Sequence, residues 1–134
     1  MKIYTETFTF KTRGPIDIID ITDNVQRIVT KSQIKNGIAH IFAPHATGII
    51  ILTENEPNLL NDIRNILEKL IPEKGDYGHP SNAHAHLRSV FLPPDKTVPI
   101  IDGKLALGTW QSIAFVETDI YPRTRTIIVT IMGE

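Results

Sequence analysis

Residues 37–53 read GIAHIFAPHATGIIILT, and the prediction of the fold begins with this stretch. Two apolar segments, residues 38–43 and 47–53, flank the short motif Pro44-His45-Ala46. Their β-branched residues predict two strands, and the unbroken apolar run of the second predicts a strand that is covered on both faces. His45 would then lie where one strand ends and the next begins, a position from which a side chain can reach a cleft.

Helices are predicted on either side of this strand pair. Thr22-Asp23-Asn24 offers helix caps before an apolar stripe that ends near Ser32, and Asn36-Gly37 is a strong turn signal. Downstream, Glu54–Pro57 would start a longer helix, which Pro72 stops. Its apolar side chains recur at helical spacing on one face: Leu59, Ile63, Ile66, Leu67 and Leu70.

The remaining segments favour strands. Residues 2–10 alternate with a period of two, whereas residues 73–85 lack any period and predict a loop. Further strands are predicted over residues 87–92, 96–101, 105–107, 112–118 and 124–132, with Asp102-Gly103 as a hairpin turn. About eight or nine strands and two helices predict an α+β fold, with mostly antiparallel β-sheets packed as a sandwich or barrel, in one domain over residues 1–134.

The composition narrows the classes of function. The chain has 134 residues, 41% hydrophobic and 22% charged, which is typical of an ordinary soluble globular protein. A net charge of -1 argues against nucleic acid as a partner. No apolar run is long enough to span a bilayer and the first residues do not resemble a secretory signal, so we expect a cytoplasmic protein without a membrane partner.

Histidines concentrate in residues 77–89, YGHPSNAHAHLRS. The chain has no cysteine, so a metal ion would have to be held by histidine and carboxylate. If this segment is extended, His84 and His86 share a face about 7 Å apart, which suits two ligands of one ion. His79 could fold back as a third donor, and His45 could be a fourth donor or an acid–base group. The alternative is that these are ordinary exposed loop histidines, and we expect His40 to be structural.

Two carboxylates are candidates for proton transfer. Glu54 stands at the start of the longer helix, where an acid can either cap the helix or face a site. Glu117 alternates with apolar residues in a predicted strand, so it is either paired with an arginine or directed into a site.

Candidate ligand-binding residues lie in three places. Arg88-Ser89 could hold an anion, because arginine can bind two phosphate oxygens at once, although a surface ion pair is the alternative for Arg88. Thr109-Trp110-Gln111 could line a pocket with a ring and an amide. Asn55 either caps the longer helix or binds a ligand.

Several motifs together resemble those of the YjbQ family, small proteins named secondary thiamine-phosphate synthases. They are Pro44-His45-Ala46-Thr47, Thr53–Pro57, Tyr77-Gly78-His79, Ala85–Ser89, Pro99–Gly103, Leu107–Gln111, Glu117 and Gly133-Glu134, in this order. The resemblance implies an α+β fold, a homotrimer with sites near subunit boundaries, and a divalent metal, zinc, at His45, His79 and His86. His84 does not match a required histidine of the family and would be an extra donor.

The resemblance also implies an activity on a small phosphorylated substrate. The family name suggests that a pyrimidine diphosphate is joined to a thiazole phosphate, with release of diphosphate. The metal or Arg88 would hold the diphosphate, and Glu54 would transfer a proton. The matched polar residues are Glu54, Asn55, Arg88, Thr109, Gln111 and Glu117. Two alternatives remain open: a metal-assisted hydrolase of a small metabolite, and a trimeric module that binds metal or ligand without catalysis.

Overall fold

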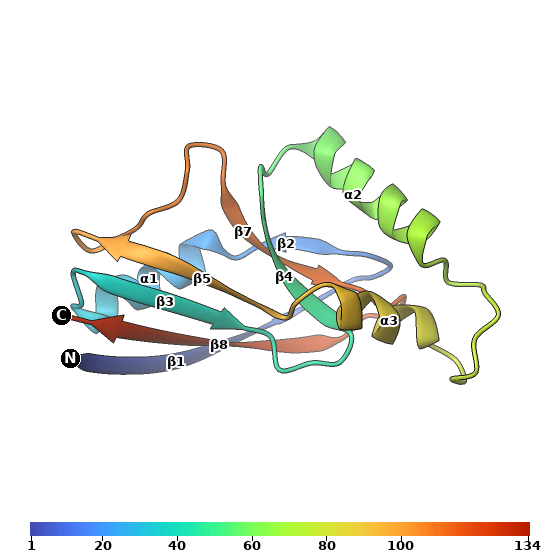
Figure 1. The fold of residues 1–134 in the computed structure, drawn as a ribbon, viewed down its shortest axis with the longest axis horizontal. Coiled ribbons are helices and arrows are strands. Elements are labelled where there is room, and N and C mark those ends of the chain that lie inside the picture. Colours follow the sequence, from blue (N-terminus) through green and yellow to red (C-terminus); the bar gives the residue numbers. More distant parts are fainter.

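Eight strands form two antiparallel sheets in the computed structural model, which describes all of residues 1–134 (Figure 1). The larger sheet has the order β1-β8-β3-β5-β6, and the smaller has the order β2-β7-β4. The strands are β1 (Lys2–Lys11), β2 (Ile18–Asp20), β3 (Gly37–Phe42), β4 (Gly48–Thr53), β5 (Asp95–Ile101), β6 (Lys104–Leu105), β7 (Ser112–Glu117) and β8 (Thr124–Gly133). The helices are α1 (Thr22–Ser32), α2 (Pro57–Leu70) and α3 (Ala83–Phe91).

The hydrophobic core lies between the two sheets and α1. Alternate residues of β8 and β3 point inward, among them Val129 and Ile41, and meet Ile50 of β4 and Phe115 of β7. Val25, Ile28 and Val29 close the core from α1 at the spacing predicted for one helical stripe. The antiparallel α+β architecture therefore agrees with the pattern of the sequence.

The third helix, α3, was not predicted. We expected a loop up to residue 85 and a strand over residues 87–92, but the chain is helical from Ala83 to Phe91. The alternation of His84, Ala85 and His86 has the period of a strand. The helical conformation is stabilised instead by tertiary contacts, which this local pattern does not reveal. Arg88 is buried and its guanidinium bonds to Thr118 and Glu68 outside the helix, and Ala85, three residues earlier on the same helical face, is buried as well.

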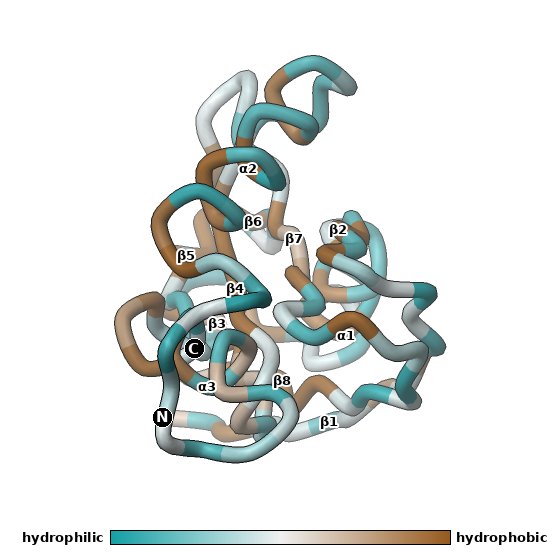
Figure 2. Tube along the Cα trace, turned by 90° about the vertical axis from the view of Figure 1, so that its right-hand side faces the viewer, coloured by the Kyte–Doolittle hydropathy of each residue, from teal (hydrophilic) through white to brown (hydrophobic).

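The longer helix, α2, packs on the sheets through a narrow contact. Leu67 is its one buried residue, and it joins Ile16, Ile49 and Val116 in a small second cluster. Leu70 lies on the same predicted apolar face, yet its side chain is 69% exposed. Figures 1 and 2 show α2 to one side of the sheets, with hydrophobic and hydrophilic positions alternating along it. Part of its apolar face therefore has no cover within one chain. No helix is long and apolar enough to cross a membrane.

A buried ion pair connects the two sheets. Arg125 of β8 donates through Nε and Nη2 to the carboxylate of Glu117 in β7, and both side chains are at most 6% exposed. Arg125 also donates to the carbonyl oxygen and hydroxyl of Thr47, just before β4. Glu117 accepts further hydrogen bonds from the Thr12 hydroxyl and the Asp119 amide. Each charge is thus surrounded by partners, as burial requires.

Replacing one partner of the Glu117–Arg125 ion pair should show how much the pair contributes to the stability of the fold. Arg125→Met leaves Glu117 charged and unpaired in the interior, so we expect it to lower the free energy of unfolding by about 3–5 kcal/mol in a denaturant titration. Lys31→Met is the matched control, because it removes the exposed Lys31–Glu6 ion pair and should change stability by less than about 1 kcal/mol. Equal losses in the two variants would contradict this role.

Candidate functional site

The helical backbone of α3 separates the two histidines that an extended chain would have brought together. Residues two apart on a helix differ by about 200° in direction, so His84 and His86 cannot share a face as predicted. His84 turns inward and is 1% exposed, whereas His86 is half-buried at the surface.

His86 instead pairs with His79 from the preceding loop. Their ring centroids are 4.8 Å apart and the rings are inclined by 61°. The two rings border an open cavity of about 380 Å³, also lined by Asp76, Tyr77, Gly78, Ala83 and Leu87. The Tyr77 hydroxyl donates to the Pro72 carbonyl at 2.6 Å, which fixes the loop that carries His79. We call this the histidine pocket, and its two imidazoles can donate to an anion or exchange a proton.

His45 does not belong to this pocket. It lies between β3 and β4 as predicted, with its Nε2 atom 2.9 Å from the Thr126 amide nitrogen and 3.0 Å from the Thr126 carbonyl oxygen. Either tautomer therefore finds a backbone partner. Burial, followed by the positive charge of Arg125, lowers the pKa of His45 below its ordinary value, so the neutral ring is favoured.

The expected three-histidine zinc site is not formed by one chain. No group of three or more histidine, cysteine, aspartate or glutamate side chains lies close enough to hold a metal ion. His79 and His86 supply two nitrogen donors, and a catalytic zinc site takes three protein ligands. A zinc ion held by a single chain therefore does not fit these residues.

Arg88 and Ser89 hold α3 in place. Arg88 is 1% exposed, and its guanidinium donates to the Ile71 carbonyl, the Thr118 carbonyl and the Glu68 carboxylate. The Ser89 hydroxyl lies 3.2 Å from the Thr118 hydroxyl. The predicted anion-binding arginine thus has a structural role, joining α3 to the end of α2 and to the chain after β7.

The two carboxylates differ sharply in environment. Glu117 is the buried partner of Arg125, which is the first of its two predicted alternatives. Glu54 is exposed at the far end of β4 from His45. The six residues of β4 span about 20 Å, so Glu54 cannot transfer a proton to a group bound beside His45 of the same chain.

Glu54 lies instead beside the other predicted ligand-binding residues. Thr53 pairs with Ser112 across β4 and β7, so Glu54 and Asn55 reach the same end of the smaller sheet as Thr109–Gln111. The Asn55 amide donates to Asp20, the Gln111 side chain accepts from the Gly108 amide, and the Trp110 side chain is 72% exposed. Figure 1 shows the connection from β4 to α2 and the connection from β6 to β7 at the upper edge of the molecule, away from α3. We call these residues the tryptophan edge: Glu54, Asn55, Thr109, Trp110 and Gln111.

Sequence reasoning missed Asp76 and Tyr77 as lining residues of the histidine pocket. Their position three and two residues before His79 was the available signal, since both lie in the same short loop. It also missed Asp119, a fully buried carboxylate that accepts from the Asn82 amide and from Arg123. Asp119 anchors the start of α3.

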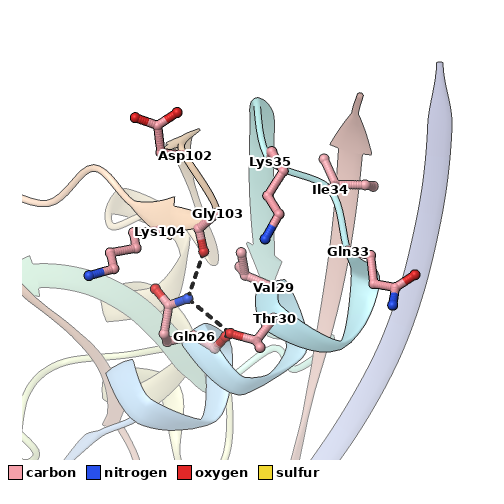
Figure 3. A pocket seen from close by; sticks show the side chains of 9 residues that line it. All are labelled: Gln26, Val29, Thr30, Gln33, Ile34, Lys35, Asp102, Gly103 and Lys104. Atoms are coloured by element: carbon pink, nitrogen blue, oxygen red, sulfur yellow. Dashed lines mark hydrogen bonds between the residues drawn. The ribbon is translucent and has the colours of Figure 1, made fainter.

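The largest cavity, about 520 Å³, lies between α1 and the β5–β6 turn (Figure 3). Gln26 spans it, donating to the Gly103 carbonyl and the Thr30 hydroxyl while accepting from the Leu105 amide. These bonds attach the β5–β6 turn to α1. The cavity contains no histidine, so its size alone does not mark it as the reactive site.

Comparisons with known proteins agree with the fold. A family model described as "UPF0047 protein YjbQ-like" matches residues 6–134. A UPF0047 protein of Methanothermobacter thermautotrophicus is 43% identical over 137 aligned residues, covering 100% of this chain and 95% of the relative. A crystal structure of a YbjQ-like protein of unknown function from Sulfolobus solfataricus P2 is 40% identical, with a TM-score of 0.96 over 99% of each chain. An uncharacterised YjbQ/UPF0047 protein from Clostridium acetobutylicum has a TM-score of 0.91 and 38% identity over 95% of this chain and 99% of its own.

His84 is the least satisfied group near the histidine pocket. Both ring nitrogens are buried and make no hydrogen bond. Burial, and then the nearby Arg88 charge, lower the pKa of His84 below its ordinary value. The unfolded chain therefore takes up a proton more readily than the folded one. The stability contributed by the neutral ring is present above about pH 6.5 and falls as the pH drops below it.

We accordingly expect His84→Leu to flatten the acid side of the stability profile. The wild type should lose more unfolding free energy than the variant between about pH 7.5 and pH 5.5. At neutral pH the variant should be as stable as the wild type or more so, because a buried polar group without a partner costs about 1–3 kcal/mol. Denaturant titrations at several pH values measure both effects, and a parallel pH dependence would contradict the assignment.

Proposed function

Since the chain belongs to the UPF0047 family of YjbQ-like proteins, we propose that it is an enzyme of small-molecule metabolism whose chemistry takes place at the histidine pocket. The observation that carries the proposal is the His79–His86 pair, two imidazoles 4.8 Å apart at an open cavity. Paired imidazoles are suited to donating hydrogen bonds to phosphate oxygens and to moving a proton.

The reaction we propose is the transfer implied by the family resemblance. A nitrogen of thiazole phosphate attacks the carbon that bears the diphosphate of the pyrimidine substrate. One C–N bond forms, one C–O bond breaks, and diphosphate leaves with the electron pair. His79 and His86 would stabilise the negative charge that develops on the leaving diphosphate, which is the kind of contribution that lowers a barrier most.

The active form is proposed to be a homotrimer in which the tryptophan edge of one subunit completes the histidine pocket of the next. Two features of one chain support this arrangement. The Trp110 side chain is largely exposed, and Val90 and Phe91 leave a second apolar surface at the end of α3, 71% and 73% exposed. Large exposed apolar side chains that gather near a polar site are typical of protein interfaces.

The proposed homotrimer would also complete the ligand set of the proposed divalent metal, zinc. His79 and His86 would provide two donors, and the third would have to come from a neighbouring subunit, because no third side chain of the same chain lies close enough. The chemistry that such an ion supplies is neutralisation of phosphate charge. Metal analysis of the purified protein tests this part of the proposal separately from the reaction.

A metal-assisted hydrolase of a small phosphorylated metabolite is the second candidate, favoured by the openness of the cavity to water. Diphosphate release measured with and without thiazole phosphate distinguishes the two reactions. Release that needs the thiazole partner supports the transferase, and release without it supports the hydrolase. Tight ligand retention with no release in either assay would indicate a non-catalytic binding module.

His86→Ala should reduce turnover by about 100-fold or more, the usual contribution of a positioned acid–base group. His40→Ala is the matched control, because His40 bonds to Asp95 on the larger sheet and does not line the histidine pocket. Unchanged turnover in His86→Ala, measured as diphosphate release, would remove the histidine pocket as the reactive site.

Subunit mixing tests the shared site directly. Trp110→Ala and His86→Ala should each be inactive alone, and mixed trimers should regain part of the activity because some interfaces then combine an intact edge with an intact pocket. The control is each variant taken alone through the same mixing procedure, which should give no gain in activity. Inactive mixed trimers, with mixing verified by mass spectrometry, would contradict a site built from two subunits.

A further inference from the structure

A second polar groove lies between the loop after β1 and helix α2. It is lined by Arg13, Gly14, Pro15, Ile16, Asp17 and Arg64, and has a volume of about 280 Å³. We call it the arginine groove. It shares no lining residue with the histidine pocket.

Arg64 has guanidinium donors to spare in this groove. Its Nε donates to the Ile16 carbonyl at 2.9 Å, and its two terminal nitrogens make no hydrogen bond within the chain. It also lacks a carboxylate partner, in contrast to the arginines that pair with Asp17, Glu68, Asp119 and Glu117. A half-buried guanidinium held by one nitrogen presents its outer edge in a fixed direction, the geometry that suits two oxygens of an anion.

The charges in the groove favour an anion. Arg13 and Arg64 contribute two positive charges, against the single carboxylate of Asp17. Asp17 is 5% exposed and accepts hydrogen bonds from the Arg13 amide and, at 3.4 Å, from the Arg13 guanidinium. Since Asp17 is turned into the protein and already has partners, the accessible part of the groove is positive.

The loop backbone provides further donors. The amides of Gly14, Ile16 and Asp17 have no hydrogen-bond acceptor within the chain. Gly14 and Ile16 have φ angles of +56° and +46°, in the left-handed region. A positive φ is costly for the β-branched Ile16, and such strain is concentrated at ligand sites. A Cβ on Gly14 would lie 2.6 Å from the Ile120 carbonyl oxygen, so the loop is also held in place by close packing.

The groove continues beneath α2, which provides room for the rest of a ligand. A neighbouring cavity of about 360 Å³ shares Pro15, Ile16 and Arg64 with the arginine groove. Its other lining residues include Asn61 and Asn65, and also the carboxylates Glu68 and Glu73, which would disfavour a second anionic group there. The two asparagines offer amide donors and acceptors to neutral polar groups. A molecule with one phosphate and a polar body would fit this arrangement better than a free ion.

From these observations, we infer that the arginine groove is a binding site for the phosphate group of a small phosphate monoester, held by Arg64 and Arg13 together with the loop amides. This site is additional to the proposed reaction at the histidine pocket and does not depend on it. A phosphate monoester and inorganic phosphate both present a tetrahedral dianion, so the groove would also bind inorganic phosphate. The test therefore compares these two ligands.

The test is an NMR titration of ¹⁵N-labelled full-length protein with inorganic phosphate and, separately, with glycerol phosphate at constant ionic strength. We expect saturable shifts of the amides of residues 14, 16 and 17 with a dissociation constant of about 1 mM or below, and tighter binding of the monoester. Arg64→Gln should weaken binding at least about tenfold, the loss of one charge-assisted pair. Arg27→Gln is the matched control, an arginine of α1 that lines a different cavity.

Arg13→Gln is the second variant, because the Arg13 side chain is 88% exposed and its removal should not disturb the fold. If Arg64→Gln does not fold, weaker binding in Arg13→Gln supports the site and unchanged binding overturns it. No saturable shift in the wild type, or equal weakening in Arg27→Gln, overturns it as well. His86→Ala should bind the monoester at this groove like the wild type, so failure of the histidine-pocket proposal would leave this result unaffected.

Discussion

The ion pair between Glu117 and Arg125 is the constraint on which the rest of the structure depends. Unpaired burial of either charge would cost several kcal/mol, so the pair favours the arrangement of the two sheets that brings Glu117 and Arg125 together. The residues that follow each partner then position the histidines. Thr126 bonds to His45, and Thr118 accepts from Arg88 and donates to the Ala85 carbonyl of α3. The same pair therefore places the helix that carries the histidine pocket.

Seven of the candidate site residues form two groups in separate parts of the molecule, the histidine pocket and the tryptophan edge, whereas His45, Arg88 and Glu117 lie in neither. The register of β4 and β7 carries Glu54 to one end of the smaller sheet, whereas α3 carries His86 to another part of the surface. The two groups differ in their chemistry: the histidine pocket has two imidazoles and Asp76, whereas the tryptophan edge has Glu54 and the exposed Trp110 but no imidazole. This separation is the physical reason why the proposed function involves more than one subunit.

Much of the fold could be predicted from periodicity, because β1, α1 and β4 turn the faces that their apolar residues define toward the core, whereas α2 forms as predicted but buries only Leu67 of its apolar face. The position of His45 between two strands was also predictable. The helix α3 was not, since it is stabilised by the contacts of Arg88 with Ile71, Thr118 and Glu68, which are distant in sequence. For the same reason the pairing of His79 with His86 was hidden, and an extended reading of His84 and His86 was wrong.

The narrow attachment of α2 has a consequence for motion. A helix that buries one residue, Leu67, can separate from the sheets at a small fraction of the global unfolding cost, because few apolar contacts are broken. Its amide hydrogens would then exchange with solvent long before those of β8 or β3. The Arg64–Ile16 hydrogen bond joins the helix to the loop before β2, and the Arg88–Glu68 ion pair joins it to α3, so both would have to break for α2 to separate.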